Sequence, residues 1–213
     1  HDGSYRKCLP GWRQESARPR RRPRVVPTQR VPGAIRCGGR DLALRSRLHF
    51  APERRHRRDV RPLERADVCT LSAAIGWLEL GNPREAQTEF RHISRDARSH
   101  PDTLDVEWRL RAELREWNDA LEVARRLIAE DPENPSGWIH QSYTLHELKR
   151  TPEARQQLLS VADTFSTIPT VAYNLACYAC QLDDPTDART WLDRAVRLAG
   201  KEKIREMALR DPD

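Results

Sequence analysis

The feature that most constrains the fold of this 213-residue chain is a spacing of 34 residues that recurs four times in its second part. A column of alanines and a column of leucines, six residues earlier, keep this spacing without a gap. The alanines are Ala86, Ala120, Ala154 and Ala188, and the leucines are Leu80, Leu114, Leu148 and Leu182. Self-similarity at a fixed period of this length indicates a repeat architecture, in which each unit packs on its neighbours.

Each period is predicted to hold two helices. In the second helix, apolar residues recur at spacings of three and four, as in Ala120, Ala124 and Leu127, which is typical of one buried helix face. Its start is marked by a proline after a capping residue, as at Asn82-Pro83. The last apolar column of this helix is Ile93, Leu127, Val161 and Ala195. We expect the alanine column where two helices approach closely, and the leucine column where the first helix closes against its partner.

The period, the helix pairs and the columns resemble the tetratricopeptide repeat (TPR) family. Trp138, Trp117 and Asp131-Pro132 match the family's aromatic and terminal proline positions. The resemblance implies an all-α, right-handed superhelix of helix–turn–helix repeats. The four expected copies span about 67–100, 101–134, 135–168 and 169–202. The run YNLACYACQL, followed by KIREMALRDPD, is similar to the closing segment of a group of bacterial TPR proteins and predicts one further helix.

Two departures from the family pattern affect these expectations. Trp108 stands where the family usually has a small residue, so the first helix of copy two is expected to be rotated or shifted. Copies one and four lack the terminal proline.

The first 65 residues differ from the rest in charge and composition. They carry a formal charge of +13, whereas residues 66–213 carry −7, and they hold seven prolines and five glycines. Like charges repel, and little apolar surface offsets the entropy of ordering, so we expect a mostly disordered segment with a short helix at 41–50. Three interpretations stay open: a tail that binds nucleic acid or an acidic protein by charge, a solvated tail without a specific partner, and a mis-assigned reading frame.

The Cys-x-x-Cys formed by Cys177 and Cys180 is predicted to be a packing feature. Both lie in the first helix of copy four, where residues three apart share one face. A structural zinc site needs four ligands, and a thioredoxin-like pair opens a helix after a strand. Five cysteines in a chain where we find no secretory signal favour reduced thiols and a cytoplasmic location.

No enzymatic motif is found in the sequence. We see no Gly-rich phosphate loop, no HExxH and no nucleophile elbow. No apolar stretch approaches the ~20 residues that span a bilayer. We therefore expect no enzymatic activity, no cofactor, no metal site and no membrane segment.

The resemblance implies that the first helix of each repeat lines a concave groove that takes peptides or helices of partner proteins. Carried over by position, the groove residues are Asp102, Asp105, Arg109 and Ala112, then Ser136, Ile139, Tyr143 and His146 with His140 at the margin, then Thr170, Tyr173, Asn174 and Cys177. The best-known family groove holds a C-terminal carboxylate with paired Lys and Asn. These positions hold no Lys and only Asn174, so we reject that function.

The leading prediction is a protein–protein interaction scaffold whose ligand is basic, with an apolar or aromatic anchor. Asp102 and Asp105 supply negative charge, and Ile139, Tyr143 and Tyr173 supply an apolar floor. The alternative is nucleic-acid or polyanion binding through residues 1–65. Deleting these residues is expected to leave the first function and to abolish the second.

Overall fold

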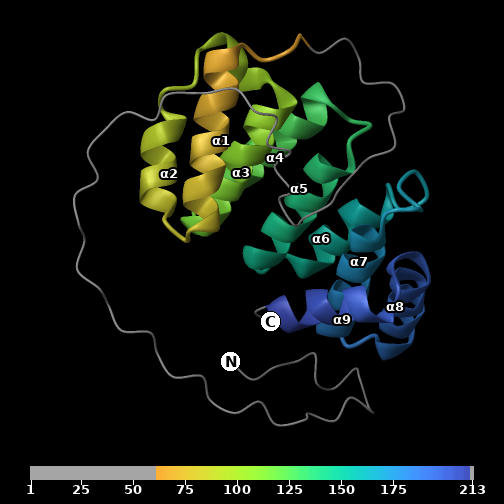
Figure 1. Ribbon diagram of the computed structural model, residues 1–213. Coiled ribbons are helices and arrows are strands. Elements are labelled where there is room, and N and C mark those ends of the chain that lie inside the picture. The colour runs from red at the N-terminus through yellow and green to blue at the C-terminus, as the bar shows by residue number, and fades with distance from the viewer. Residues whose placement is uncertain (1–60, 212–213) are drawn as a thin grey trace, which may run out of the picture. The chain divides into compact units, whose positions relative to one another are not determined.

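The computed structural model describes residues 61–211, and every regular element within them is a helix. The helices follow one another as four pairs and one further helix (Figure 1). In chain order they are α1 (Arg65–Glu79), α2 (Pro83–Phe90), the short 3₁₀ helix η2 (Asp96–Ser99), α3 (Pro101–Glu113), α4 (Trp117–Glu130), α5 (Pro135–Glu147), α6 (Thr151–Leu159), α7 (Pro169–Gln181), α8 (Pro185–Ala199) and α9 (Lys201–Arg210). The predicted all-α repeat fold is confirmed. The predictions for residues 1–60 lie outside the described residues.

The first helices of the last three pairs keep the sequence period in their bounds. They begin at Pro101, Pro135 and Pro169 and each is 13 residues long. A proline fits the first turn of a helix because the amide it lacks has no partner inside the helix. Trp108 therefore does not shift α3 along the chain.

The turn inside each pair repeats a single backbone conformation. Gly81, Arg115, Lys149 and Asp183 all have positive φ, between 57° and 71°. The amide that follows each of them donates to the carbonyl five residues earlier, as from Asn82 to Trp77 at 2.9 Å. This is the Schellman end of a helix, which satisfies otherwise unpaired carbonyls. Only the first copy has the glycine that this conformation favours.

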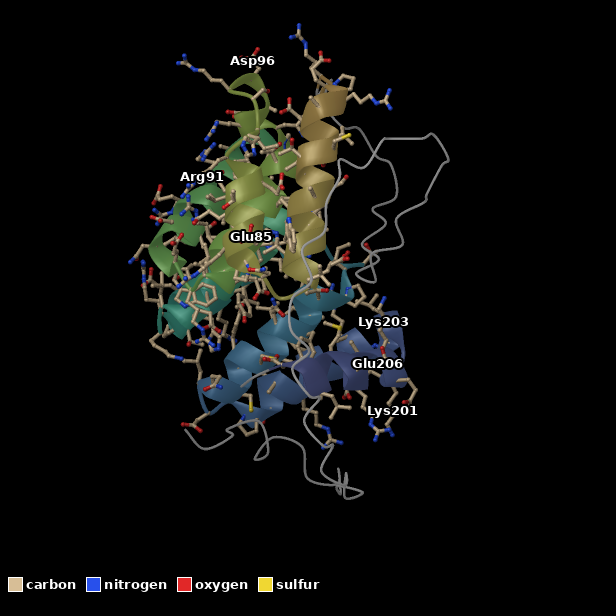
Figure 2. The ribbon with its side chains drawn as sticks, turned by 60° about the vertical axis from the view of Figure 1, so that its left-hand side comes forward. Glu85, Arg91, Asp96, Lys201, Lys203 and Glu206 are labelled. Atoms are coloured by element: carbon tan, nitrogen blue, oxygen red, sulfur yellow. The ribbon has the colours of Figure 1, made fainter. Side chains whose placement is uncertain are left out.

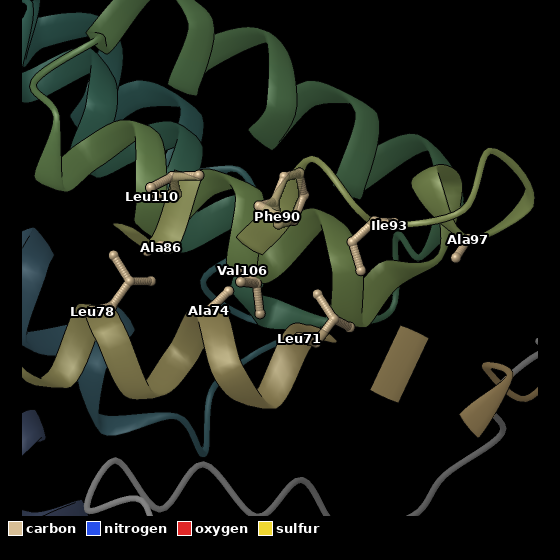
Figure 3. Packing of buried hydrophobic residues seen from close by; sticks show 9 residues of the cluster. All are labelled: Leu71, Ala74, Leu78, Ala86, Phe90, Ile93, Ala97, Val106 and Leu110. Carbon is tan, nitrogen blue, oxygen red and sulfur yellow. The ribbon is translucent and has the colours of Figure 1, made fainter. Parts of the chain in front are cut away.

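Stacking of the pairs joins each first helix to two neighbours. Contacts link α1 to α3, α3 to α5 and α5 to α7, and each second helix also contacts the next first helix. Figure 3 shows the cluster that joins copy one to α3, in which Leu71 and Ala74 of α1 face Val106 of α3. The same cluster contains Leu78, Ala86, Phe90, Ile93, Ala97 and Leu110.

The alanine column lies in the interior as predicted, and the leucine column does so only in part. Ala86, Ala120 and Ala154 have no exposed surface. Leu80, however, is 76% exposed and Leu182 is 39% exposed. These leucines sit at the C-cap of the first helix, where the chain leaves the helix, so the prediction that the whole column closes the pair is wrong.

Two of the second helices end earlier than the column pattern predicts. α2 ends at Phe90 and α6 at Leu159, so Ile93 and Val161 lie in the turns that follow. In copy one the turn is held by Asp67, whose two carboxylate oxygens accept from the amide and the hydroxyl of Ser94, each at 2.8 Å. Ile93 still packs in the interior, with 3% of its surface exposed.

At Gly137 in α5, the neighbouring helix α4 leaves no room for a side chain. A Cβ at this position would lie 2.9 Å from Cγ1 and 3.1 Å from the amide nitrogen of Ile128 in α4. At Gly76 in α1, by contrast, a Cβ would meet no atom within 4 Å. The two glycines therefore test whether α4 and α5 are packed as closely as the structure shows.

We expect Gly137→Ala to lower the free energy of unfolding by about 1–3 kcal/mol, because the added methyl group overpacks the contact with Ile128. The matched change Gly76→Ala should raise it by about 0.5–1 kcal/mol, because alanine is favoured over glycine inside a helix. Urea unfolding followed by circular dichroism measures both. Effects of the same sign would contradict the described packing.

Candidate functional site

The residues predicted to line the groove lie at matching positions on adjacent first helices. On α3 they are Asp102, Asp105 and Arg109, at spacings of three and four, which places them on one helix face. Ser136, Ile139 and Tyr143 occupy the same positions on α5, and α3 contacts α5 directly. Asp102 is exposed and the other five are partly exposed, so this face reaches the surface on both helices.

Asp105 and His140 connect the two helices. The Nε2 of His140 lies 2.8 Å from Oδ1 of Asp105. Burial by itself raises the pKa of the Asp105 carboxyl, but the hydrogen bond to His140 and the charges of His140 and Arg109 outweigh it and hold that pKa below its usual value. Asp105 is thus an anion that helps to hold α5 against α3, while 38% of its side chain remains exposed.

Trp108 completes the contact between α3 and α5. Its ring stacks on that of His140, with centroids 3.7 Å apart and planes 6° from parallel. Its Nε1 donates to Oγ1 of Thr144 at 2.9 Å, and Thr144 in turn donates to the carbonyl of His140 at 2.7 Å. The bulky tryptophan fits because it meets a flat ring and a short side chain. Trp108 points toward the next repeat, and so does Ser142, the aligned residue of α5, which accepts from the Tyr178 hydroxyl of α7 at 3.3 Å. Because the two aligned side chains point the same way, α3 is not rotated relative to α5.

Tyr143 lies between two tryptophans. Its ring centroid is 6.1 Å from that of Trp108 and 6.1 Å from that of Trp117, and both rings meet it edge to face. Such arrangements are favourable for aromatic pairs and restrict the ring. The sequence prediction included Tyr143 but not Trp108 and Trp117, the two tryptophans that contact it. The signal was present, because Trp108 breaks the small-residue column directly before Arg109, the residue of copy two that aligns with Tyr143.

Copy four does not offer the surface that the resemblance implied. Tyr173 and Cys177 are each 8% exposed and pack in one cluster with Ile204 of α9. The Tyr173 hydroxyl donates to Oδ2 of Asp211, just after α9, at 3.0 Å. Burial, with the nearby Cys177 and Asp211, raises the pKa of Tyr173 well above its usual value. The terminal helix therefore covers two of the predicted groove residues, while Asn174 is partly exposed.

His146 also lies inside the fold. It is 6% exposed, its Nδ1 is 2.9 Å from Oγ1 of Thr151, and its ring centroid lies 5.2 Å from that of Tyr178. These contacts connect α5 to the start of α6 and to α7. His146 thus supports the turn between the helices of copy three and does not present its ring to a ligand.

Cys177 and Cys180 are not joined to each other. Cys177 is a buried thiol, whereas Cys180 is disulfide-bonded. The expectation of reduced cysteines is therefore wrong at Cys180, because the spacing of cysteines in a sequence does not determine which of them are bonded. Cys177 and Cys180 pack in separate apolar clusters. Residues 61–211 contain no group of three or more His, Cys, Asp or Glu that could hold a metal ion.

No helix within residues 61–211 is long and apolar enough to cross a membrane.

Helix pairs stacked at a constant period define an α-helical repeat protein. Residues 107–167 match the family model of the tetratricopeptide repeat, so the chain contains tetratricopeptide repeats, as the sequence predicted. This fold supports a general role as a protein–protein interaction scaffold. No curated protein matches the sequence.

Solved structures of TPR proteins share the fold. TTC0263, a thermophilic TPR protein of Thermus thermophilus, matches with a TM-score of 0.60 at 19% identity, covering 65% of this chain and 77% of that chain. PilF of Pseudomonas aeruginosa matches with a TM-score of 0.58 at 23% identity, covering 65% and 64%. YrrB, described as a TPR protein with an unusual peptide-binding site, matches with a TM-score of 0.55 at 16% identity, covering 68% and 75%.

We expect Asp105→Asn to lower the free energy of unfolding at neutral pH by no more than about 1 kcal/mol, because water screens the partly exposed pair. A carboxyl whose pKa is lowered by folding stabilises the protein above its unfolded-state pKa of about 4, and this contribution is lost as the pH falls through the folded-state pKa. The deficit of the variant should therefore shrink below about pH 4. Urea unfolding at several pH values measures it.

Glu113→Gln removes an exposed carboxylate from the same helix and is the matched control, with no expected change in the pH dependence. A deficit of Asp105→Asn that stays constant down to the lowest pH would contradict a lowered pKa of the Asp105 carboxyl in its contact with His140.

Proposed function

We propose that this protein is an interaction scaffold that binds a peptide or helix of another protein across α3 and α5. The observation that carries the proposal is Tyr143, a partly exposed aromatic ring held between Trp108 and Trp117. Aromatic side chains that are fixed before binding lose little conformational entropy when a ligand arrives. They also dominate the energetics of many protein interfaces.

Ile139 extends the aromatic surface into an apolar floor. It lies one helical turn before Tyr143 on α5 and is partly exposed. Residues four apart lie next to each other on a helix, so the two side chains provide one continuous apolar patch. The patch favours a ligand with an apolar or aromatic anchor.

The charge around this floor favours a basic ligand. Asp102 is exposed at the start of α3. In Asp105, His140 contacts Oδ1, and Oδ2 accepts no hydrogen bond from the described residues. A lysine or arginine of the ligand would thus find acceptors beside the apolar floor. Arg109 lies on the same face and limits the net negative charge, so we expect these carboxylates to affect the association rate and salt dependence more than the affinity.

The proposed site is confined to copies two and three, with Thr170 and Asn174 of copy four at its border. α9 covers Tyr173 and Cys177, which shortens the groove that the family resemblance implied. The similar fold of YrrB, which is described with a peptide-binding site, supports peptide binding as the mode of action. We propose no enzymatic activity and a cytoplasmic location.

The alternative, nucleic-acid or polyanion binding through the basic segment 1–65, concerns residues that lie almost entirely outside the described part of the chain. It remains a prediction, and comparison of the full chain with a chain lacking residues 1–65 separates the two functions.

We expect peptides selected against the full chain from a random library to be basic and to contain an aromatic or large apolar residue. Tyr143→Ala should weaken their binding about tenfold or more, as for other aromatic anchors at interfaces. Tyr143→Phe keeps the ring and should bind within about threefold of the wild type. Asp102→Asn should mainly flatten the dependence of affinity on ionic strength. Fluorescence anisotropy measures these affinities.

Thermal unfolding of each variant serves as the control for folding, because Tyr143 also contacts Trp108 and Trp117. Selection of acidic peptides, or binding that is indifferent to Tyr143→Ala in a folded variant, would contradict the proposal.

A further inference from the structure

One face of α8 gathers two arginines around apolar side chains. Thr190, Trp191, Arg194, Arg197 and Leu198 line a hollow of about 560 Å³. At about 100° per residue, these five positions fall within roughly 120° of the helix circumference. We call this face the α8 arginine surface. None of its residues belongs to the site proposed on α3 and α5.

Arg194 is held in place on this surface. Its guanidinium lies 5.2 Å from the ring centroid of Trp191, within the range of a cation–π contact. One of its terminal nitrogens donates to the carbonyl of Ser166, before α7, at 3.3 Å. A guanidinium has five N–H donors, so most of them remain for a ligand.

Neither Arg194 nor Arg197 forms an ion pair with a carboxylate of residues 61–211. Arginines elsewhere in this part of the chain do so, as Arg155 with Asp187 at 2.7 Å and Arg125 with Glu122. Asp193 is the acidic neighbour on α8; it is rotated by about 100° from Arg194 but lies one helical turn before Arg197, with which it forms no ion pair. The two guanidinium groups of the α8 arginine surface are therefore not held in ion pairs within the described fold, and Arg194 in particular has no carboxylate one turn away on α8.

An apolar contact accompanies this charge. Leu198 is 39% exposed and follows Arg194 by one helical turn, so the two side chains are neighbours. A large apolar side chain beside cations matches a ligand that combines carboxylates with an apolar residue.

We propose that the α8 arginine surface is a docking site for an acidic peptide segment of a partner protein. Carboxylates of the segment bind Arg194 and Arg197, since the planar guanidinium pairs with a carboxylate through two parallel hydrogen bonds. An apolar residue of the segment packs on Leu198. A nucleic acid is the less suitable occupant, because the Trp191 ring carries Arg194 on its face and packs partly in the core, which hinders base stacking.

The test uses the full chain and a labelled Asp/Glu-rich peptide that contains one leucine. Arg194→Gln with Arg197→Gln should weaken binding about tenfold or more. The matched control is Arg91→Gln with Arg189→Gln, which removes the same charge from two exposed arginines outside the surface and should change affinity less than about twofold. In Figure 2, Arg91 of copy one is labelled at the upper left, and Lys201, Lys203 and Glu206 of α9, the helix that follows α8, are labelled at the lower right. All variants keep the basic residues 1–65, so any attraction of the acidic peptide to this segment contributes equally to every measured affinity.

Leu198→Ser tests the apolar contact. This variant should bind the leucine-containing peptide more weakly than the wild type does. Its affinity for the same peptide with serine in place of leucine should be unchanged. Arg197→Gln alone, at an exposed position, keeps the test valid if the double variant does not fold, and should weaken binding about threefold or more. Equal losses in both double variants would overturn the proposal. Displacement of the peptide by a single-stranded oligonucleotide that binds through Arg194 and Arg197 would also overturn it, in favour of a polyanion site.

Discussion

The close approach of helices at the alanine column is the contact on which the rest of this structure depends. Ala86, Ala120 and Ala154 have no exposed surface, so α2, α4 and α6 each present only a methyl group at a contact that excludes solvent. Packed helices lie about 8–10 Å apart, and small side chains at the contact give the shorter distances. Gly137 likewise leaves no room for a side chain between α4 and α5, the first helix of the next pair. A spacing fixed at these points explains why helix bounds and turn conformations recur with the sequence period.

The same contacts that join copies two and three also form the candidate site. His140 binds Asp105 at 2.8 Å and stacks on Trp108, while Trp108 and Tyr143 meet edge to face. A ligand on Tyr143 would therefore touch side chains that hold α3 against α5. Together with the α8 arginine surface, we propose two surfaces of opposite charge preference, which suits a scaffold that holds two different segments.

Sequence reasoning reached the repeat and its first helices because these depend on local signals. Pro101, Pro135 and Pro169 begin α3, α5 and α7, and proline restricts the chain in the same way in any fold. The groove of copy four could not be predicted so well. Its residues match the family positions, but Tyr173 is covered by α9, and how a non-repeating terminal helix packs depends on tertiary contacts that no period encodes. The exposure of Leu80 has a similar origin, since a column shows which positions recur but not how each one is covered.

Amide hydrogen exchange of the full chain, with and without a basic peptide selected for binding, tests the central claim most directly. Exchange slows where a ligand stabilises or shields the backbone. If the peptide binds across the first helices, protection should increase in residues 101–113 and 135–147 and remain unchanged in 83–90 and 151–159. Protection confined to the second helices α2, α4 or α6, with no change in α3 and α5, would contradict the account.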